Sequence, residues 1–149
     1  MDPLGGSGAI VVPPTEITLR YEQGMSKYQF LKRATALQEL GEQGQLLKAR
    51  NPVARDNTVA RRYRSDIIGR VWDQYHTPNP EFADSLISRI RDPRGLQADH
   101  VWELQLGGPD VAGNLRLLDG DTNRLIGAQI RSQIRNLPIG AEVRVRIEG

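Results

Sequence analysis

The sequence predicts an α+β domain, and three patterns support that class. Polar and apolar residues alternate from Thr15 to Tyr21, which is typical of a strand with one buried face. Further along the chain, segments with apolar residues spaced three or four apart predict helices. Between Leu96 and about Arg135 we expect a strand, a long loop, a second strand and a helix, followed by a C-terminal strand.

Length and composition limit what the chain can be. Its 149 residues suit one compact domain with or without a tail. They carry a formal net charge of +2 and include no cysteine and two histidines. A chain without cysteine forms no disulfide and has no thiol nucleophile, so any metal site must use Asp, Glu, Asn or His. No stretch of about 18 apolar residues is present, so no membrane-spanning helix is expected. The first residues do not have the pattern of a secretory signal peptide.

We expect three regions along the chain. Residues 1–14 are rich in glycine and proline and are predicted to form a flexible leader or linker. Residues 15–95 are predicted to form a mainly helical supporting region. Residues 96–149 are predicted to hold the candidate chemistry and the C-terminal strand.

Ser26 is the predicted N-cap of the first helix, which runs to about Leu40 and is broken by Gly41 and Gly44. The residues that follow its helical spacing are Tyr28, Leu31, Ala34 or Thr35, and Leu37 or Gln38. Asn57 is expected to cap a second helix that extends through Trp72.

A third helix is predicted from Asn79-Pro80 to about Arg91, because proline is favoured at the first helical position. The residues it is expected to bury are Phe82, Leu86, Ile87 and Ile90.

The stretch from Lys48 to Arg70 is locally basic, with seven basic and two acidic residues. Arginine prevails in the whole chain, and its planar guanidinium suits phosphate groups. Two interpretations stay open: a solvated helix face, or a flank that contacts nucleic-acid phosphates beside an active site.

The most informative residues lie at the end of the strand predicted after Leu96. Asp99 and His100 are adjacent there, so their side chains point in different directions. A helix that begins near Asp121 would bring Asn123 close to that strand end. Asp99 and Asn123 would then offer two oxygen ligands to a hard divalent cation such as Mg²⁺. An imidazole titrates near neutral pH, so His100 can take a proton from water.

A second asparagine, Asn114, lies where the next strand is expected to begin. Its carbonyl group could hold one imidazole nitrogen of His100 and aim the other. The alternative is a structural role, because asparagine is common in turns. Taken together, the residues predict metal-assisted hydrolysis of a phosphodiester bond.

The order Asp99-His100, Gly107-Gly108, Asn114 and Asn123 resembles the motif of HNH endonucleases, which have a ββα-metal fold. The resemblance covers Leu96 to about Arg135. It implies that Asp99 and Asn123 are metal ligands, that His100 is the general base and that Asn114 orients it. It also implies one divalent metal ion. Because the last ligand is Asn123 rather than histidine, Mg²⁺ is favoured, Mn²⁺ is possible, and Zn²⁺ or Ni²⁺ is less suitable.

Other residues near the motif are weaker candidates. Glu103 is interpreted either as an outer-shell or metal-bridging carboxylate or as a structural loop residue. His76 is expected at the surface and Trp102 in packing. The arginines expected to contact substrate phosphates are Arg116, Arg124, Arg131 and Arg135.

The predicted function is that of an HNH endonuclease acting on nucleic acid, with DNA favoured over RNA. The layout of leader, helices and HNH motif also resembles, more loosely, the C-terminal toxin domains of bacterial polymorphic or contact-delivered toxins. That resemblance implies an antibacterial effector that is secreted or delivered without a Sec signal, acts in the target-cell cytoplasm, has no membrane partner and is neutralised by an acidic immunity protein. The alternatives are a phage or restriction-associated nicking enzyme and a non-catalytic nucleic-acid-binding domain.

Overall fold

The computed structural model describes residues 12–50, 57–92 and 95–149. Most of the predicted leader therefore lies outside the described residues. The elements are the helices α1 (Lys27–Glu42), α2 (Asn57–Tyr75), α3 (Pro80–Arg91) and α4 (Gly120–Ile134), the strands β1 (Thr15–Arg20), β2 (Leu96–His100), β3 (Leu115–Asp119) and β4 (Val143–Glu148), and the short 3₁₀ helices η1 (Leu104–Leu106) and η2 (Ala112–Asn114). The predicted α+β class is confirmed.

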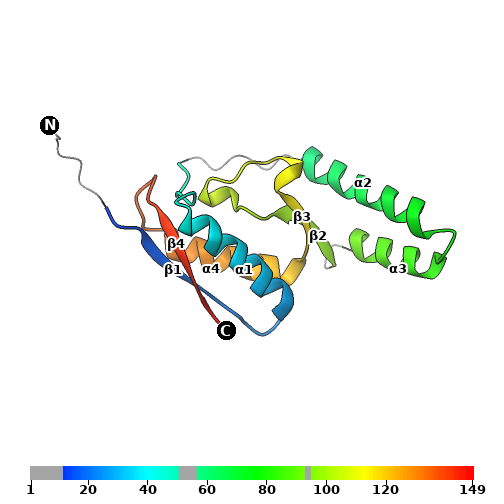
Figure 1. Cartoon of the computed structure of the whole chain (residues 1–149), viewed down its shortest axis with the longest axis horizontal. Coiled ribbons are helices and arrows are strands. Elements are labelled where there is room, and N and C mark those ends of the chain that lie inside the picture. Colours follow the sequence, from blue (N-terminus) through cyan, green and yellow to red (C-terminus); the bar gives the residue numbers. More distant parts are fainter. Residues whose placement is uncertain (1–11, 51–56, 93–94) are drawn as a thin grey trace.

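The described strands form two separate pairs. The first and last strands, β1 and β4, pair in parallel, with Ile17 opposite Val145. The strands β2 and β3 form an antiparallel hairpin, with Asp99 opposite Arg116. Figure 1 shows this hairpin between the β1–β4 pair and the two helices α2 and α3. The hairpin is followed directly by α4, so the order of strand, loop, strand and helix is the one expected.

The main core lies where α1 and α4 pack against β1 and β4 (Figure 1). It takes residues from both ends of the chain, and its largest fully buried members are Phe30, Ile17, Leu19, Leu37, Leu46, Leu106, Ile126, Ile130 and Val143. Helix α4 contributes Ile126, Ile130 and Ile134, which recur every four residues and are all buried, so they form one apolar face. This core fixes α4, and with it the helix start that carries Asn123.

The buried face of α1 differs from the predicted one. Ser26 caps the helix as expected, since its hydroxyl accepts a hydrogen bond from the Gln29 amide at 3.3 Å. However, Tyr28 and Leu31 are exposed. The residues that face the interior are Phe30, Arg33, Ala34, Leu37 and Gly41. Ala34 and Leu37 are therefore buried as predicted, whereas Phe30 and Arg33 take the interior positions expected for Tyr28 and Leu31.

Gly41 does not break α1, contrary to expectation. It is buried inside the helix, which ends at Glu42. A Cβ at this position would lie 3.2 Å from the Arg144 Cα atom and from the Val143 carbonyl oxygen. The glycine therefore allows β4 to pass close to the helix. Gly44, in the turn that follows, has a φ of +75°, so it does have the helix-ending conformation.

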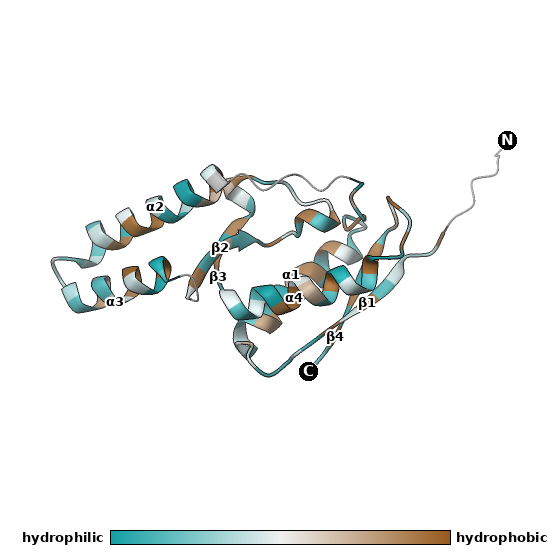
Figure 2. Ribbon diagram, turned by 180° about the vertical axis from the view of Figure 1, so that it is seen from behind, coloured by the Kyte–Doolittle hydropathy of each residue, from teal (hydrophilic) through white to brown (hydrophobic). Residues whose placement is uncertain are grey.

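Helices α2 and α3 form a hairpin with a small core of its own. Val71, Ala83 and Ile87 form its buried centre. In Figure 2, hydrophobic and hydrophilic residues alternate along both helices. The Asn79 cap is confirmed, because its side chain accepts a hydrogen bond from the Phe82 amide at 3.1 Å.

Two details of this helical hairpin differ from the prediction. Phe82 was expected to be buried but is 44% exposed. Its ring packs edge-on against that of Tyr75, with the ring centroids 4.9 Å apart. The helix α2 also extends to Tyr75, three residues beyond the predicted end at Trp72.

No helix in the part of the chain that the structure describes is long and apolar enough to span a membrane.

The two phenylalanines of the chain provide a test of the main core. Phe30→Ala removes a fully buried ring and should lower the free energy of unfolding by about 3–5 kcal/mol. Phe82→Ala removes an exposed ring and should cost less than about 1.5 kcal/mol. Urea unfolding of both variants, followed by circular dichroism, measures the difference. Equal losses would contradict the position of the core.

Candidate active site

The candidate site lies where β2 ends and α4 begins. Asp119 caps α4, since its carboxylate accepts hydrogen bonds from the Thr122 amide at 3.0 Å and the Thr122 hydroxyl at 2.6 Å. The same hydroxyl accepts a hydrogen bond from the Ser26 amide at 2.7 Å. The first turns of α1 and α4 are therefore tied together, and Asn123 follows directly on this junction.

Asp99 and Asn123 come together as the sequence predicts. The Asn123 side-chain amide donates a hydrogen bond to the Asp99 carboxylate, although 24 residues separate them. Their contact is possible because α4 starts immediately after β3, which pairs with β2. In this contact the side-chain nitrogen of Asn123 faces Asp99, and its side-chain oxygen accepts from Arg33.

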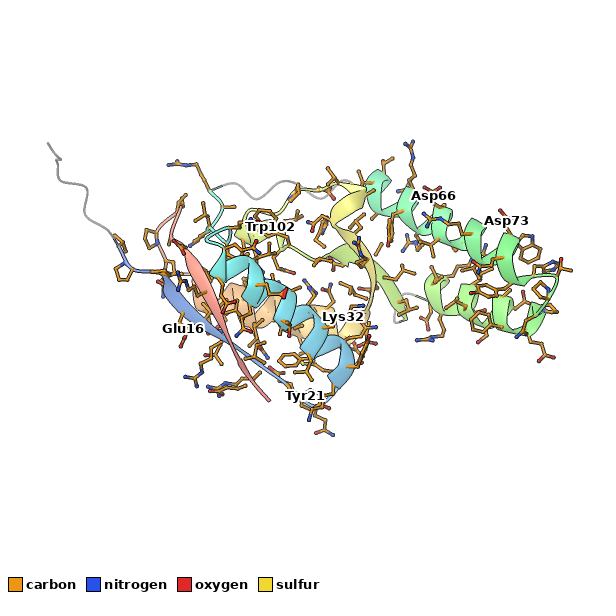
Figure 3. The ribbon with its side chains drawn as sticks, viewed as in Figure 1. Glu16, Tyr21, Lys32, Asp66, Asp73 and Trp102 are labelled. Atoms are coloured by element: carbon orange, nitrogen blue, oxygen red, sulfur yellow. The ribbon has the colours of Figure 1, made fainter. Side chains whose placement is uncertain are left out.

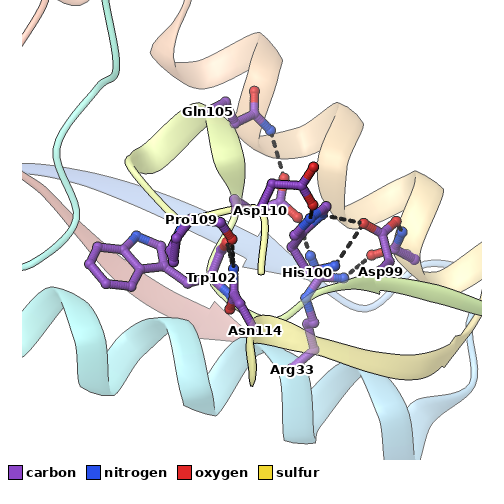
Figure 4. A network of polar contacts seen from close by, with 10 residues as sticks. Arg33, Asp99, His100, Trp102, Gln105, Pro109, Asp110 and Asn114 are labelled. Atoms are coloured by element: carbon purple, nitrogen blue, oxygen red, sulfur yellow. Dashed lines mark hydrogen bonds and ion pairs between the residues drawn. The ribbon is translucent and has the colours of Figure 1, made fainter. Parts of the chain in front are cut away.

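His100 is buried, with 2% of its surface exposed, and a carboxylate faces each of its ring nitrogens (Figure 4). Its Nε2 lies 2.7 Å from the Asp110 Oδ1 atom, and its Nδ1 lies 3.2 Å from the Asp99 Oδ1 atom. A carboxylate can only accept, and a neutral imidazole has a single N–H group. In a neutral imidazole that N–H can serve only one of the two carboxylates, and the shorter contact favours Nε2–H toward Asp110.

This arrangement leaves Nδ1 as the nitrogen that can accept a proton. Asp99 Oδ1 already accepts a hydrogen bond from the His100 backbone amide at 2.8 Å. Asp110 fixes the orientation of the ring through its contact with Nε2. His100 is therefore oriented to act as a base on the side of the Asp99–Asn123 pair.

Asn114 does not hold the imidazole, which corrects the role expected for it. Its side-chain oxygen accepts a hydrogen bond from the Trp102 amide at 2.9 Å, and its side-chain nitrogen donates to the carbonyls of Trp102 and Pro109, both at 2.9 Å. These three bonds close the loop between β2 and β3. Asp110, which lies in that loop, takes the orienting role instead.

The glycine pair shapes the same loop. Gly107 has a φ of +91°, a conformation that L side chains rarely adopt. A Cβ on Gly108 would collide with the Trp102 carbonyl. Trp102 also packs as predicted, with its indole N–H donating to the Leu106 carbonyl at 2.8 Å. The glycines and Asn114 together set the path that carries Asp110 back to His100.

Arg33 is a site residue that the sequence prediction missed. It is 4% exposed, and its guanidinium donates to the Asn123 side-chain oxygen and to the Glu103 carboxylate. Glu103 also accepts a hydrogen bond from the Gln105 side chain at 2.9 Å. Glu103 is therefore the partner of a buried cation, which fits the structural interpretation. The one available signal was the position of Arg33 in register with the apolar residues Phe30 and Leu37.

The four arginines predicted as phosphate contacts do not all lie near the site. Arg116 is opposite Asp99 in the hairpin, and Arg124 directly follows Asn123. Counted from Asn123 along the α4 axis, Arg131 lies roughly 12 Å away and Arg135 roughly 18 Å away, at 1.5 Å per residue. All four are exposed. Arg116 and Arg124 thus remain the closer candidates.

The residues present fit a hard divalent cation. Asp99 supplies a carboxylate and Asn123 an amide oxygen, and Mg²⁺ binds such ligands while keeping several waters. The amide oxygen has two lone pairs, so it can accept from Arg33 and still bind a cation. Within residues 12–50, 57–92 and 95–149, no group of three His, Cys, Asp or Glu side chains is placed to hold a metal.

His76, the second histidine, lies on the α2–α3 hairpin rather than at the site. It is exposed and stacks on Trp72, with ring centroids 3.7 Å apart. It is therefore a surface residue, as predicted.

No protein-family model, curated protein or solved structure matches the chain significantly. Function must then be argued from the chemistry of the site.

The role of Asn114 can be tested by a change of one atom. Asn114→Asp keeps the acceptor for the Trp102 amide but places an oxygen against two carbonyls, so it should lower the free energy of unfolding by about 1–3 kcal/mol. Urea unfolding gives the value, with the exposed Asn136→Asp as the matched control. If the two variants unfold at the same urea concentration, Asn114 does not brace the loop.

Proposed function

We propose that this protein is a metal-dependent endonuclease of the HNH type, with DNA as its favoured substrate. One observation carries the proposal. The base His100 is held by Asp110 so that Nδ1 faces a carboxylate that itself contacts the amide of Asn123. A general base beside two hard metal ligands is the set of groups that hydrolysis of a phosphodiester requires.

Each residue has a distinct role in the proposed reaction. Asp99 and Asn123 would hold the cation, which supplies Lewis acidity to the scissile phosphate and to the leaving oxygen when bound. His100 takes a proton from the attacking water at Nδ1. Asp110 fixes the orientation of the ring through its contact with Nε2. Arg33 holds the Asn123 side chain in place.

We also propose, on the loose resemblance to toxin domains, that the nuclease is an antibacterial effector with an acidic immunity protein. The charge of α2 supports an acidic partner. Four arginines on this helix, Arg61, Arg62, Arg64 and Arg70, outnumber the acidic Asp66 and Asp73 that Figure 3 labels on the same helix. Opposite charges on two surfaces speed their association. Growth arrest of bacteria that express the wild type, but not His100→Ala, tests the effector role.

The two histidines of the chain allow a matched test of the base. His100→Ala should lower the rate of plasmid cleavage in Mg²⁺ by about 10²- to 10⁴-fold, because the proton acceptor is lost. His76→Ala, on the exposed hairpin, should cleave like the wild type. His100→Gln, which keeps a polar group between the two carboxylates, should be as inactive as the alanine variant. Circular dichroism confirms that each variant is folded.

Two outcomes would overturn the proposed reaction. One is cleavage by wild type that persists in EDTA. The other is a folded His100→Gln variant that cleaves at the wild-type rate.

The metal ligands are tested by the metal dependence of the rate. Asp99→Asn removes the one negative charge that Asp99 and Asn123 offer to a cation. The Mg²⁺ concentration for half-maximal cleavage should therefore rise at least about 10-fold, since even outer-shell changes cost that much. The control is Asp121→Asn, an exposed carboxylate in the first turn of α4. An unchanged Mg²⁺ dependence in Asp99→Asn would exclude Asp99 as a ligand.

A further inference from the structure

A groove of about 300 Å³ lies between α1 and the strand β3, next to the candidate site. Its walls include Tyr28, Lys32 and Arg33 from α1 and Arg116 and Leu117 from β3. Figure 3 labels Lys32 on α1, near the β2–β3 hairpin. Arg33 belongs both to the groove and to the Glu103–Asn123 network, so the groove opens beside the proposed metal ligands.

The groove is positively charged. Three of its lining side chains are cationic, Lys32, Arg33 and Arg116, and none of the lining residues is acidic. Among the described residues, neither Lys32 nor Arg116 forms an ion pair with a carboxylate. Arg116 is held instead by the carbonyls of Leu115 at 2.6 Å and Gly113 at 3.3 Å, which accept from its guanidinium. Two positive charges therefore face the groove without neutralisation.

Arg33 contributes a second and independent observation. Its Nε atom is buried and has no hydrogen-bond partner among the described residues. A buried N–H without an acceptor costs free energy. Because Arg33 also lines the groove, its guanidinium adds a cationic group close to any anion bound there.

The groove also has an apolar and aromatic part. Leu117, Val101 and Ala36 supply aliphatic surface. The Tyr28 side chain is 73% exposed, and the Lys32 ammonium lies 5.9 Å from its ring centroid. An exposed ring beside cations is the combination that binds single-stranded nucleic acid, because bases stack on the ring and phosphates meet the cations.

We propose that this groove binds one nucleic-acid strand next to the bond that the protein cleaves. Lys32 and Arg116 contact its phosphates, and Tyr28 stacks on a base. A volume at the lower limit of small-ligand pockets, about 300–1,000 Å³, suits a nucleotide unit rather than a duplex. The inference rests on the proposed nuclease function for the position of the cleaved bond. The binding that it predicts can be measured without cleavage.

The experiment is a fluorescence anisotropy titration of a labelled single-stranded oligodeoxynucleotide in EDTA, where metal-dependent cleavage does not occur. Lys32→Ala should weaken binding about 5- to 10-fold at 0.1 M salt and lower the salt slope of log K by about 1, as for the loss of one phosphate contact. Arg116→Ala should do the same. Tyr28→Ala should weaken binding with an unchanged salt slope, because stacking releases no counterion.

Lys27→Ala is the matched control. Lys27 is on the same helix and its ammonium lies 5.7 Å from the ring of Tyr21, much as Lys32 lies over Tyr28, but it does not line the groove. Binding by Lys27→Ala should equal wild type. Lys27, Lys32 and Tyr28 are all exposed, so the variants should fold normally.

Two results would overturn the proposal that the groove binds a nucleic-acid strand. One is that Lys27→Ala and Lys32→Ala bind the oligonucleotide with the same affinity and salt slope. The other is that a polyglutamate peptide displaces the oligonucleotide at equal charge concentration, which would indicate an acidic protein as the occupant. Failure of the nuclease itself is separate, because it appears as an absence of plasmid cleavage in Mg²⁺ with binding in EDTA unaffected.

Discussion

The buried guanidinium of Arg33 is the constraint on which the site depends. A charge in the interior is tolerated only when it is paired and hydrogen-bonded, and removal of one partner of a buried pair typically costs about 3–5 kcal/mol. Arg33 meets this condition by binding Glu103 from the loop and Asn123 from α4. Helix α1 must therefore pack where these two groups converge. That packing also sets the distance between Asn123 and Asp99, so a residue far from the motif in sequence controls the geometry of the motif.

Much of the fold follows from local patterns. The caps at Ser26, Asn79 and Asp119 form because short polar side chains satisfy the free amides of a helix start, and this chemistry can be read without tertiary information. The apolar repeat of α4 is equally local. The contact between Asp99 and Asn123 could also be predicted, because a helix that starts directly after a hairpin strand must begin beside the neighbouring strand's end.

The remainder of the site depends on long-range packing. Asp110 reaches His100 only because the loop folds back through the bonds of Asn114, and the sequence shows no pattern that distinguishes a loop carboxylate of this kind from a turn residue. Arg33 was missed for a related reason, since an arginine within an apolar face is normally assigned to solvent. The face of α1 was also ambiguous, because Tyr28 and Phe30 lie on different sides of one helix and only the packing against β4 selects between them.

The parallel pairing of β1 with β4 has a consequence for the order of folding. The first strand of the fold finds its only described partner in the last one, 128 residues later by the register of Ile17 and Val145. Closing so long a segment costs chain entropy, and before β4 is present β1 can offset it mainly through its contacts with α4, such as the bond between the Thr18 amide and the Gln133 side chain. On the ribosome, the core that seats α1 and α4 can close only after β4 has emerged. A nascent chain would therefore hold its histidine, carboxylates and amide apart, and these groups would assemble only late in the synthesis of the domain.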